Sequence, residues 1–193
     1  MSYISMAEIL QPCKVGSAEI QIFTVDEKAS SYTFFRSYVP AGKYARLKIN
    51  GHVIMSDTPM EWRTNRECIY YAHGDVLIGG LGIGMIIMAI QDNESVKSIT
   101  VVEKNPDVIA AVKDQLPLND KVRIIEGDVY TYVPDRRYDC VYMDIWGDIS
   151  EDTYTDMVKL KRKYGHFLKP LSESPKRFNK CWAEYNAKNG VPF

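Results

Sequence analysis

Four short apolar runs of the sequence each end in glycines or in an acidic residue. The residues at these ends are Gly80, Gly82, Gly84, Glu103, Asp128 and Asp144. Glycine has no Cβ and tolerates positive φ, so a glycine-rich backbone can pass close to a ligand. Carboxylates accept hydrogen bonds from hydroxyl and amino groups, and they can take a proton during a reaction. The pattern therefore predicts a ligand site built from one glycine loop and three acids.

The spacing of the glycines limits the kind of ligand. Gly80, Gly82 and Gly84 form a G-x-G-x-G loop, whereas a dinucleotide-binding loop would place its third glycine at Met85. The sequence has no G-x-x-x-x-G-K-[ST] motif, so we do not expect a nucleoside triphosphate. Glu103 follows the loop by about 20 residues, a position from which a carboxylate can accept hydrogen bonds from ribose hydroxyls. The loop and this acid together predict a nucleoside ligand.

Strands that alternate with helices position these residues. We expect strands over 76–78, 96–102, 122–125 and 138–143, and helices that begin near 85 and 105. Asn105 is the expected N-cap of the second helix, with Pro106 at its first position. This alternation predicts parallel pairing in a doubly wound, Rossmann-like α/β sheet, which binds ligands beyond the carboxyl ends of its strands. Asp128, beyond the third strand, can then accept a hydrogen bond from an adenine amino group.

Residues 1–56 follow a different pattern, in which polar and apolar residues alternate in short pieces. Asn50-Gly51 between two such pieces is a strong hairpin signal. We therefore expect a small antiparallel β unit over 1–56 and the ligand-binding domain over 57–193. The second domain opens as a polar loop and a short helix. Asp57 and Glu61 there either face the ligand pocket or, as polar loop residues, lie in solvent, and we expect the latter.

The segment after Ser150 reads as helical. We expect helices over 153–163 and 175–186 and no later strand, so that the parallel sheet is truncated after its fourth strand. An uncovered sheet edge exposes unpaired backbone groups and invites association. The pattern therefore predicts that the C-terminal helices or a second subunit cover this edge, and we expect a homodimer.

The composition is typical of a globular protein without a polyanionic partner. Of 193 residues, 46% are hydrophobic and 25% charged, and the net charge of −1 favours neither nucleic acid nor a membrane as partner. No apolar stretch approaches the ~18 residues of a spanning helix, and no signal peptide is visible, so we expect a cytoplasmic protein. The four cysteines and three histidines are scattered, and their spacing predicts no metal site.

Four motifs resemble those of the class I S-adenosylmethionine-dependent methyltransferases. They are Asp75–Gly84, Ile99–Pro106, Val122–Asp128 and Tyr138–Asp144. The N-terminal hairpin is similar to the small β unit of the spermidine-synthase-like branch of that family. The resemblance implies that the loop binds S-adenosylmethionine or its decarboxylated form. It also implies that Glu103 holds the ribose, that Asp128 holds the adenine, and that Asp144 sits over the reacting group.

Departures from the spermidine synthase pattern leave the reaction open. No glutamine follows the hairpin turn, and Asp144 and Asp148 are four residues apart instead of three. We expect a methyltransferase acting on a small molecule or another polar acceptor. Asp144 would orient the acceptor or remove its proton. Trp146 either forms a wall of the acceptor pocket or, as is more common for a buried tryptophan, only packs in the core. The alternatives are aminopropyl transfer from the decarboxylated cofactor and a non-catalytic nucleoside-binding partner protein.

Overall fold

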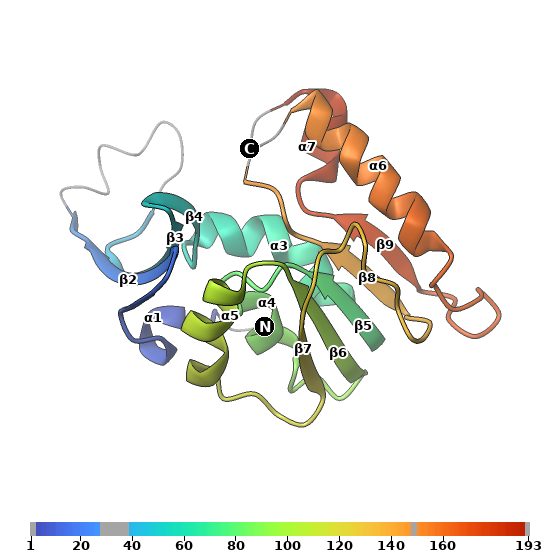
Figure 1. Ribbon diagram of the computed structural model, residues 1–193, viewed down its shortest axis with the longest axis horizontal. Coiled ribbons are helices and arrows are strands. Elements are labelled where there is room, and N and C mark those ends of the chain that lie inside the picture. Colours follow the sequence, from blue (N-terminus) through green and yellow to red (C-terminus); the bar gives the residue numbers. More distant parts are fainter. Residues whose placement is uncertain (1–2, 28–38, 148–149, 192–193) are drawn as a thin grey trace.

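Two β-sheets and the helices around them make up the fold in the computed structural model, which describes residues 3–27, 39–147 and 150–191 (Figure 1). A four-stranded antiparallel sheet comes first in the chain, and a five-stranded parallel sheet follows. Helix α3 (Pro59–Tyr71) lies between them in the sequence. The fold is the predicted Rossmann-like α/β architecture with a small N-terminal antiparallel unit.

The antiparallel sheet is a meander that follows the short helix α1 (Met6–Ile9). Its strands are β1 (Cys13–Val15), β2 (Ala18–Val25), β3 (Gly42–Ile49) and β4 (His52–Ser56). The predicted hairpin joins β3 to β4. Asn50 and Gly51 have φ values of 50° and 82°, the two positive angles that a type I′ turn requires.

The parallel sheet has the strand order β7-β6-β5-β8-β9. The strands are β5 (Gly74–Gly79), β6 (Val96–Glu103), β7 (Val122–Glu126), β8 (Cys140–Met143) and β9 (Phe178–Cys181). The chain first builds outward from β5 to β7 and then returns to the other side of β5 with β8. This return creates a topological switch point between β5 and β8, where ligands of such sheets bind.

Helices cover both faces of the parallel sheet, with α6 on the side away from α4 and α5 (Figure 1). These helices are α4 (Met85–Ile90), α5 (Pro106–Val112) and α6 (Glu151–Gly165). Side chains of β5 alternate between the faces, as strand geometry requires. Val76 and Ile78 pack in the cluster with α4 and α5, whereas Leu77 packs in the cluster with α6. The first cluster continues into the antiparallel sheet through Ile20 and Leu47, so both sheets share buried apolar contacts.

Polar residues at the helix starts fix where two of these helices begin. The predicted cap of α5 forms, because Asn105 Oδ1 accepts a hydrogen bond from the Asp107 backbone N at 3.0 Å. Ser150 Oγ accepts from the Thr153 backbone N at 3.1 Å and caps α6 in the same way. Each bond satisfies a backbone donor that has no partner inside its helix.

The sheet extends one strand beyond the predicted fourth strand. β9 pairs in parallel with β8, so the predicted absence of a later strand is wrong. The helix predicted over 175–186 is likewise wrong, because that segment holds β9 and only the start of α7 (Glu184–Asn189). The strand is four residues long and includes Asn179 and Lys180, so no hydrophobic alternation marks it. Pairing with β8, a tertiary contact, decides its conformation.

A partly buried ion-pair cluster connects the C-terminal segment to the amino ends of the parallel strands. Lys169 Nζ lies 2.6 Å from Asp75 Oδ2 and 2.7 Å from Asp139 Oδ2. The second aspartate also accepts a hydrogen bond from the Asp75 backbone N at 2.7 Å. Lysine contacts lower the pKa of both aspartates even though desolvation, the largest influence on each, raises it. The cluster lies at the opposite end of the sheet from the glycine loop.

None of the helices described is long and apolar enough to cross a membrane. The longest of them, α6, places Met157, Leu160 and Tyr164 against the sheet. The homodimer and the division of the chain at residue 56 stay predictions.

Candidate active site

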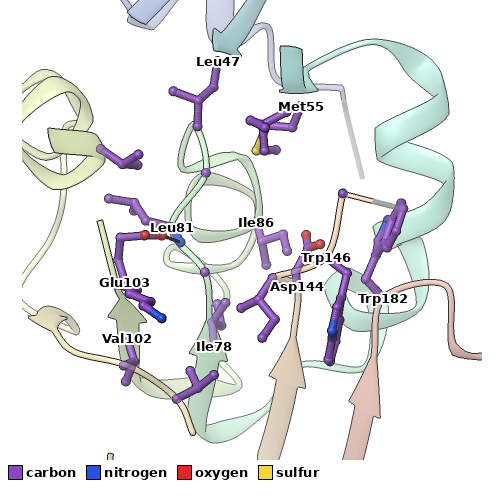
Figure 2. A pocket seen from close by; sticks show the side chains of 18 of the residues that line it. Leu47, Met55, Ile78, Leu81, Ile86, Val102, Glu103, Asp144, Trp146 and Trp182 are labelled. Carbon is purple, nitrogen blue, oxygen red and sulfur yellow. Dashed lines mark hydrogen bonds between the residues drawn. The ribbon is translucent and has the colours of Figure 1, made fainter. Parts of the chain in front are cut away.

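A cavity of ≈ 660 Å³ lies at the carboxyl ends of the parallel strands, at the switch point between β5 and β8. Figure 2 shows Leu47 and Met55 of the antiparallel unit on one side of it and the ends of the parallel strands on the other. Its lining includes five of the residues predicted from the sequence: Gly80, Gly82, Glu103, Asp128 and Asp144. The strand ends therefore bring these residues around one continuous space.

The glycine loop follows a path that side chains would obstruct. The φ values are 96° at Gly80, 53° at Gly82 and 80° at Gly84, all in the left-handed region. A Cβ at Gly80 would clash with the carbonyl oxygen of Asp144, and one at Gly82 would clash with Met55 Sδ. Gly84 is the N-cap of α4 and is not part of the cavity lining. The chain's own packing thus requires these glycines, and the backbone of the first two faces the cavity.

Met55 joins the hairpin to the glycine loop. Its Sδ accepts a hydrogen bond from the Ile83 backbone N at 3.3 Å, and the side chain lies against Gly82. Val53 and Ile54, its neighbours in β4, also line the cavity and are 54% and 44% exposed. The antiparallel unit therefore forms an apolar wall of the site. Nothing in the sequence around Met55 signals this contact.

Glu103 lies at the end of β6 and braces the loop. Its Oε2 accepts a hydrogen bond from the Leu81 backbone N at 2.8 Å, and its Oε1 accepts from the Asn105 backbone N at 2.7 Å. The side chain is partly exposed toward the cavity. An ionised carboxylate has about four acceptor sites, so roughly two remain for a ligand.

Asp128 lies beyond the end of β7 and is paired within the protein. Its Oδ2 lies 2.9 Å from Lys104 Nζ, and its Oδ1 accepts from the Tyr130 backbone N at 2.9 Å. The hydrogen bond from the lysine, followed by that from the backbone, lowers the pKa of this carboxyl. Asp128 is therefore ionised at neutral pH and can still accept a hydrogen bond from a ligand.

Asp144 follows β8 directly and projects into the cavity near Trp146 and Trp182 (Figure 2). Its backbone N donates to the Gly79 carbonyl oxygen at 2.8 Å, which continues the parallel pairing past the strand end. Burial, followed by repulsion from Glu61, raises the pKa of Asp144 to about 8. A carboxyl with this pKa exchanges its proton close to neutral pH, the property needed in a general base. Asp148, which the sequence pairs with it, lies outside the described residues.

Glu61 is a site residue that the sequence reasoning missed. It lies in the first turn of α3, lines the cavity and is 9% exposed, so its expected place in solvent is wrong. Burial raises the pKa of its carboxyl to about 7. Residues of β4 and of the parallel strand ends line the same cavity as Glu61, and a helical pattern alone does not show which surfaces face a helix, which explains the error.

Asp57 is buried as well, but it serves the fold. Its Oδ2 accepts from the Met6 backbone N at 2.7 Å, and its Oδ1 accepts from the Ala45 backbone N at 2.7 Å. The side chain is 0% exposed, so the predicted solvation of Asp57 is also wrong. It connects α1 to β3 and does not belong to the cavity lining.

Hydrogen bonds connect the backbone of Glu61 to β8 and to the segment after β9. The Asn65 side chain donates to the Glu61 carbonyl oxygen at 3.1 Å and accepts from Tyr142 Oη at 2.9 Å. Tyr142 lies in β8, two residues before Asp144. Thr64 makes the second connection. Its Oγ1 donates to the Glu61 carbonyl oxygen at 3.0 Å and accepts from the indole Nε1 of Trp182, the residue after β9, at 3.1 Å. These contacts connect the first turn of α3 to β8 and to the end of β9.

Apart from Glu61, Asp144 and Glu103, of which Glu103 accepts two backbone hydrogen bonds, the charged residues of the cavity lining are ion-paired. Lys104 binds Asp128, and Asp156 lies 3.0 Å from Lys159. Among the described residues, no cation lies within ion-pair distance of Glu61 or Asp144. Within the same parts of the chain no group of three or more metal-binding side chains is found. The acceptor end of the cavity therefore carries two carboxyls without a counter-charge.

No protein-family model matches the sequence, and no curated protein matches it. Solved structures share parts of the fold. N-methyltransferase NodS from Bradyrhizobium japonicum WM9 is 16% identical with a TM-score of 0.45, over 58% of this chain and 64% of that one. The CcbJ methyltransferase from Streptomyces caelestis is 19% identical with a TM-score of 0.44, over 55% and 45%. The DhpI–SAH complex is 19% identical with a TM-score of 0.45, over 57% and 52%.

The chain spans about half the length of these structures, from 45% to 64%. At such identities and TM-scores the likeness concerns part of the fold and assigns no activity. The geometry of the cavity has to carry any functional conclusion.

Proposed function

We propose that this chain binds S-adenosylmethionine and transfers its methyl group to a small-molecule acceptor. One observation carries the proposal: the glycine loop, Glu103 and Asp144 border a single cavity of ≈ 660 Å³ at the switch point of a parallel sheet. This volume suits a nucleoside together with a small acceptor, since ligand pockets measure about 300–1,000 Å³.

The residues around the glycine loop fit a nucleoside. The two free acceptor positions of Glu103 match two ribose hydroxyls, and Asp128 offers an acceptor for an amino group on a base. Leu81, Val102 and Val129 supply apolar surface for a flat ring. Glu103 and Asp128 are therefore proposed as cofactor-binding residues, together with the backbone at Gly80 and Gly82. For Gly84 we propose a supporting role at the start of α4.

Asp144 is the proposed catalytic residue. The sulfonium of the bound cofactor would supply an already activated methyl group, so the protein chiefly has to align an acceptor and manage its proton. Asp144 lies at the end of the strand next to the loop, and its raised pKa lets it take a proton near neutral pH. Trp146 and Trp182 exclude water from its surroundings.

One observation favours aminopropyl transfer as a second candidate, the reaction of the spermidine-synthase-like branch. Lys104 is the one lysine in the described lining, and it is already paired with Asp128. The described lining therefore presents no free cation to the α-carboxylate of S-adenosylmethionine, a group that the decarboxylated cofactor lacks. An acidic cavity also favours the more positive of the two ligands.

Calorimetry with four ligands tests both candidates. The ligands are S-adenosylmethionine, S-adenosylhomocysteine, methylthioadenosine and decarboxylated S-adenosylmethionine. Methyl transfer predicts that the first two bind at least tenfold more tightly than the last two. The strongest binding by the decarboxylated form would favour aminopropyl transfer, and no binding by any of the four would refute a nucleoside site.

A further inference from the structure

We propose that the acceptor is an amine with an apolar body, whose nitrogen sits between the carboxyls of Glu61 and Asp144. The inference rests on the proposed function, because it names the substrate class of the same cavity. It assigns to Glu61, a residue of α3 outside the parallel sheet, a role in selecting the acceptor.

The first argument for an amine comes from the charges of the site. Glu61 and Asp144 come from different elements, yet both line the same cavity, and repulsion from Glu61 contributes to the raised pKa of Asp144. Glu61 is buried and Asp144 is only partly exposed, so two ionised carboxyls here are costly unless a cation or a shared proton compensates them. No described residue supplies the cation, so the matching ligand is one that brings its own. A protonated amine meets this requirement, whereas a hydroxyl or a carboxylate does not.

The second argument, for an apolar body, comes from the walls of the cavity. Ile86, Trp146 and Trp182 lie near Asp144 (Figure 2), and Ile54 and Met60 add further apolar surface to the cavity. Of the other lining acids, Asp128 pairs with Lys104, Asp156 pairs with Lys159, and Glu103 accepts two backbone hydrogen bonds and is proposed to hold the ribose. The described cavity thus offers one cation site and apolar surface beside it. An amine with an aliphatic or aromatic body fits both, whereas a polyamine would bring a second charge without a matching acid.

Proton transfer follows from the same arrangement. The bound ammonium gives one proton to the Asp144 carboxylate and becomes a neutral amine with a free lone pair. That lone pair forms the new N–C bond to the methyl carbon while the C–S bond breaks and its electron pair remains on sulfur. The product is a methylated ammonium, which Glu61 stabilises, and Asp144 passes its proton to water. The charge balances, because two cations enter and one cation plus one proton leave, beside a neutral thioether.

Binding experiments on wild-type protein test the charge requirement. The protein is first saturated with S-adenosylhomocysteine and then titrated with 2-phenylethylamine or with 2-phenylethanol, which has the same body without the charge. We expect the amine to bind at least tenfold more tightly than the alcohol. It should also release protons at pH 7, measured in two buffers of different ionisation enthalpy, because a cation favours the ionised carboxyls. Equal affinity for both compounds, or no proton release, would overturn the proposal.

A substitution at Glu61 and a matched control on the same helix test the role of Glu61. Glu61→Gln keeps the size of the side chain and removes its charge, so amine affinity should fall about tenfold or more while affinity for S-adenosylhomocysteine stays within twofold. The matched control is Glu67→Gln on the same helix, an exposed acid that pairs with Lys180 away from the cavity. Equal losses in the two variants, or no loss in the first, would remove Glu61 from the site. Proton release by the wild-type protein still tests the charge requirement if Glu61→Gln does not fold.

A diamine separates the apolar body from the charge. If 1,4-diaminobutane binds more tightly than 2-phenylethylamine, the apolar part of the proposal is wrong. Failure to bind S-adenosylhomocysteine at the outset refutes the proposed function and this inference with it. Binding of S-adenosylhomocysteine without selection for the amine refutes only the inference.

Discussion

Replacing Glu103 by alanine tests the proposed cofactor site most directly, because this side chain has two separable roles. Its carboxylate oxygens hold the Leu81 and Asn105 backbone N–H groups at 2.8 and 2.7 Å. The same oxygens are proposed to accept hydrogen bonds from ribose. A single substitution therefore perturbs the fold of the loop and the affinity for the ligand, and the two effects have to be measured apart.

The structural effect can be bounded from the two hydrogen bonds. Bonds to a charged acceptor contribute about 1.5–3 kcal/mol each when their loss leaves a buried group unsatisfied. Glu103 is partly exposed, so water can replace it at the freed N–H groups. We expect a loss of about 1–3 kcal/mol in the free energy of unfolding. For a chain of this size that lowers Tm by roughly 2–4 °C per kcal/mol.

The effect on binding adds to this loss. Removing the acceptor of two ribose hydroxyls should weaken binding of S-adenosylhomocysteine roughly 10- to 100-fold, measured by calorimetry at a temperature where the variant is folded. Glu126→Ala is the matched control. Glu126 lies opposite Glu103 in the register of β6 and β7, is exposed and is not part of the cavity lining. Unchanged affinity in Glu103→Ala, or an equal loss in the control, would refute the assignment of Glu103 to ribose.

Three further changes test other parts of the molecule. Asp144→Asn should lower turnover about 10²- to 10⁴-fold while cofactor affinity stays unchanged, and wild-type turnover should rise with pH up to about 8 as Asp144 ionises. Because the folded pKa of Asp144 lies above its ordinary value of 3.8, wild-type stability should fall as pH rises between these values, and Asp144→Asn should lessen that slope in denaturant titrations. Gly82→Ala should lower the free energy of unfolding by about 2–4 kcal/mol, because φ is positive there and the new Cβ clashes with Met55. The control Gly51→Ala should lower it by about 1 kcal/mol, because a Cβ there meets nothing within 4 Å. Equal losses in the two variants would contradict the packing argument. Lys169→Met should cost about 2–4 kcal/mol at pH 7. The cost should shrink as pH falls below 3.8 toward the lowered pKa values at which the two aspartates take up protons in the folded protein; a loss that does not depend on pH would contradict the ion-pair account.

Local patterns predicted much of the fold because the interactions that they report are local. Asn50-Gly51 determines its turn through two positive φ angles, and Asn105 caps α5 through a bond to a residue two positions away. Strands that alternate with helices imply parallel pairing whatever the partner strands are. β9 was not predicted, because its conformation depends on a tertiary contact and not on a local one. Its four residues carry no alternation, and they form a strand because β8 presents an open edge.

The sequence by itself determined where the acids and glycines stand relative to the strand ends, and hence that Glu103 and Asp144 would meet at one edge of the sheet. Only the tertiary structure decided what that edge faces. The antiparallel unit packs against the glycine loop through Met55, and Glu61 is buried beside the same cavity although its local pattern indicates solvent. Burial depends on which distant surface covers a helix face, and that information is spread over the whole chain. For the same reason, the raised pKa values of Glu61 and Asp144 follow from burial, and that of Asp144 also from repulsion by Glu61, neither of which a sequence window contains.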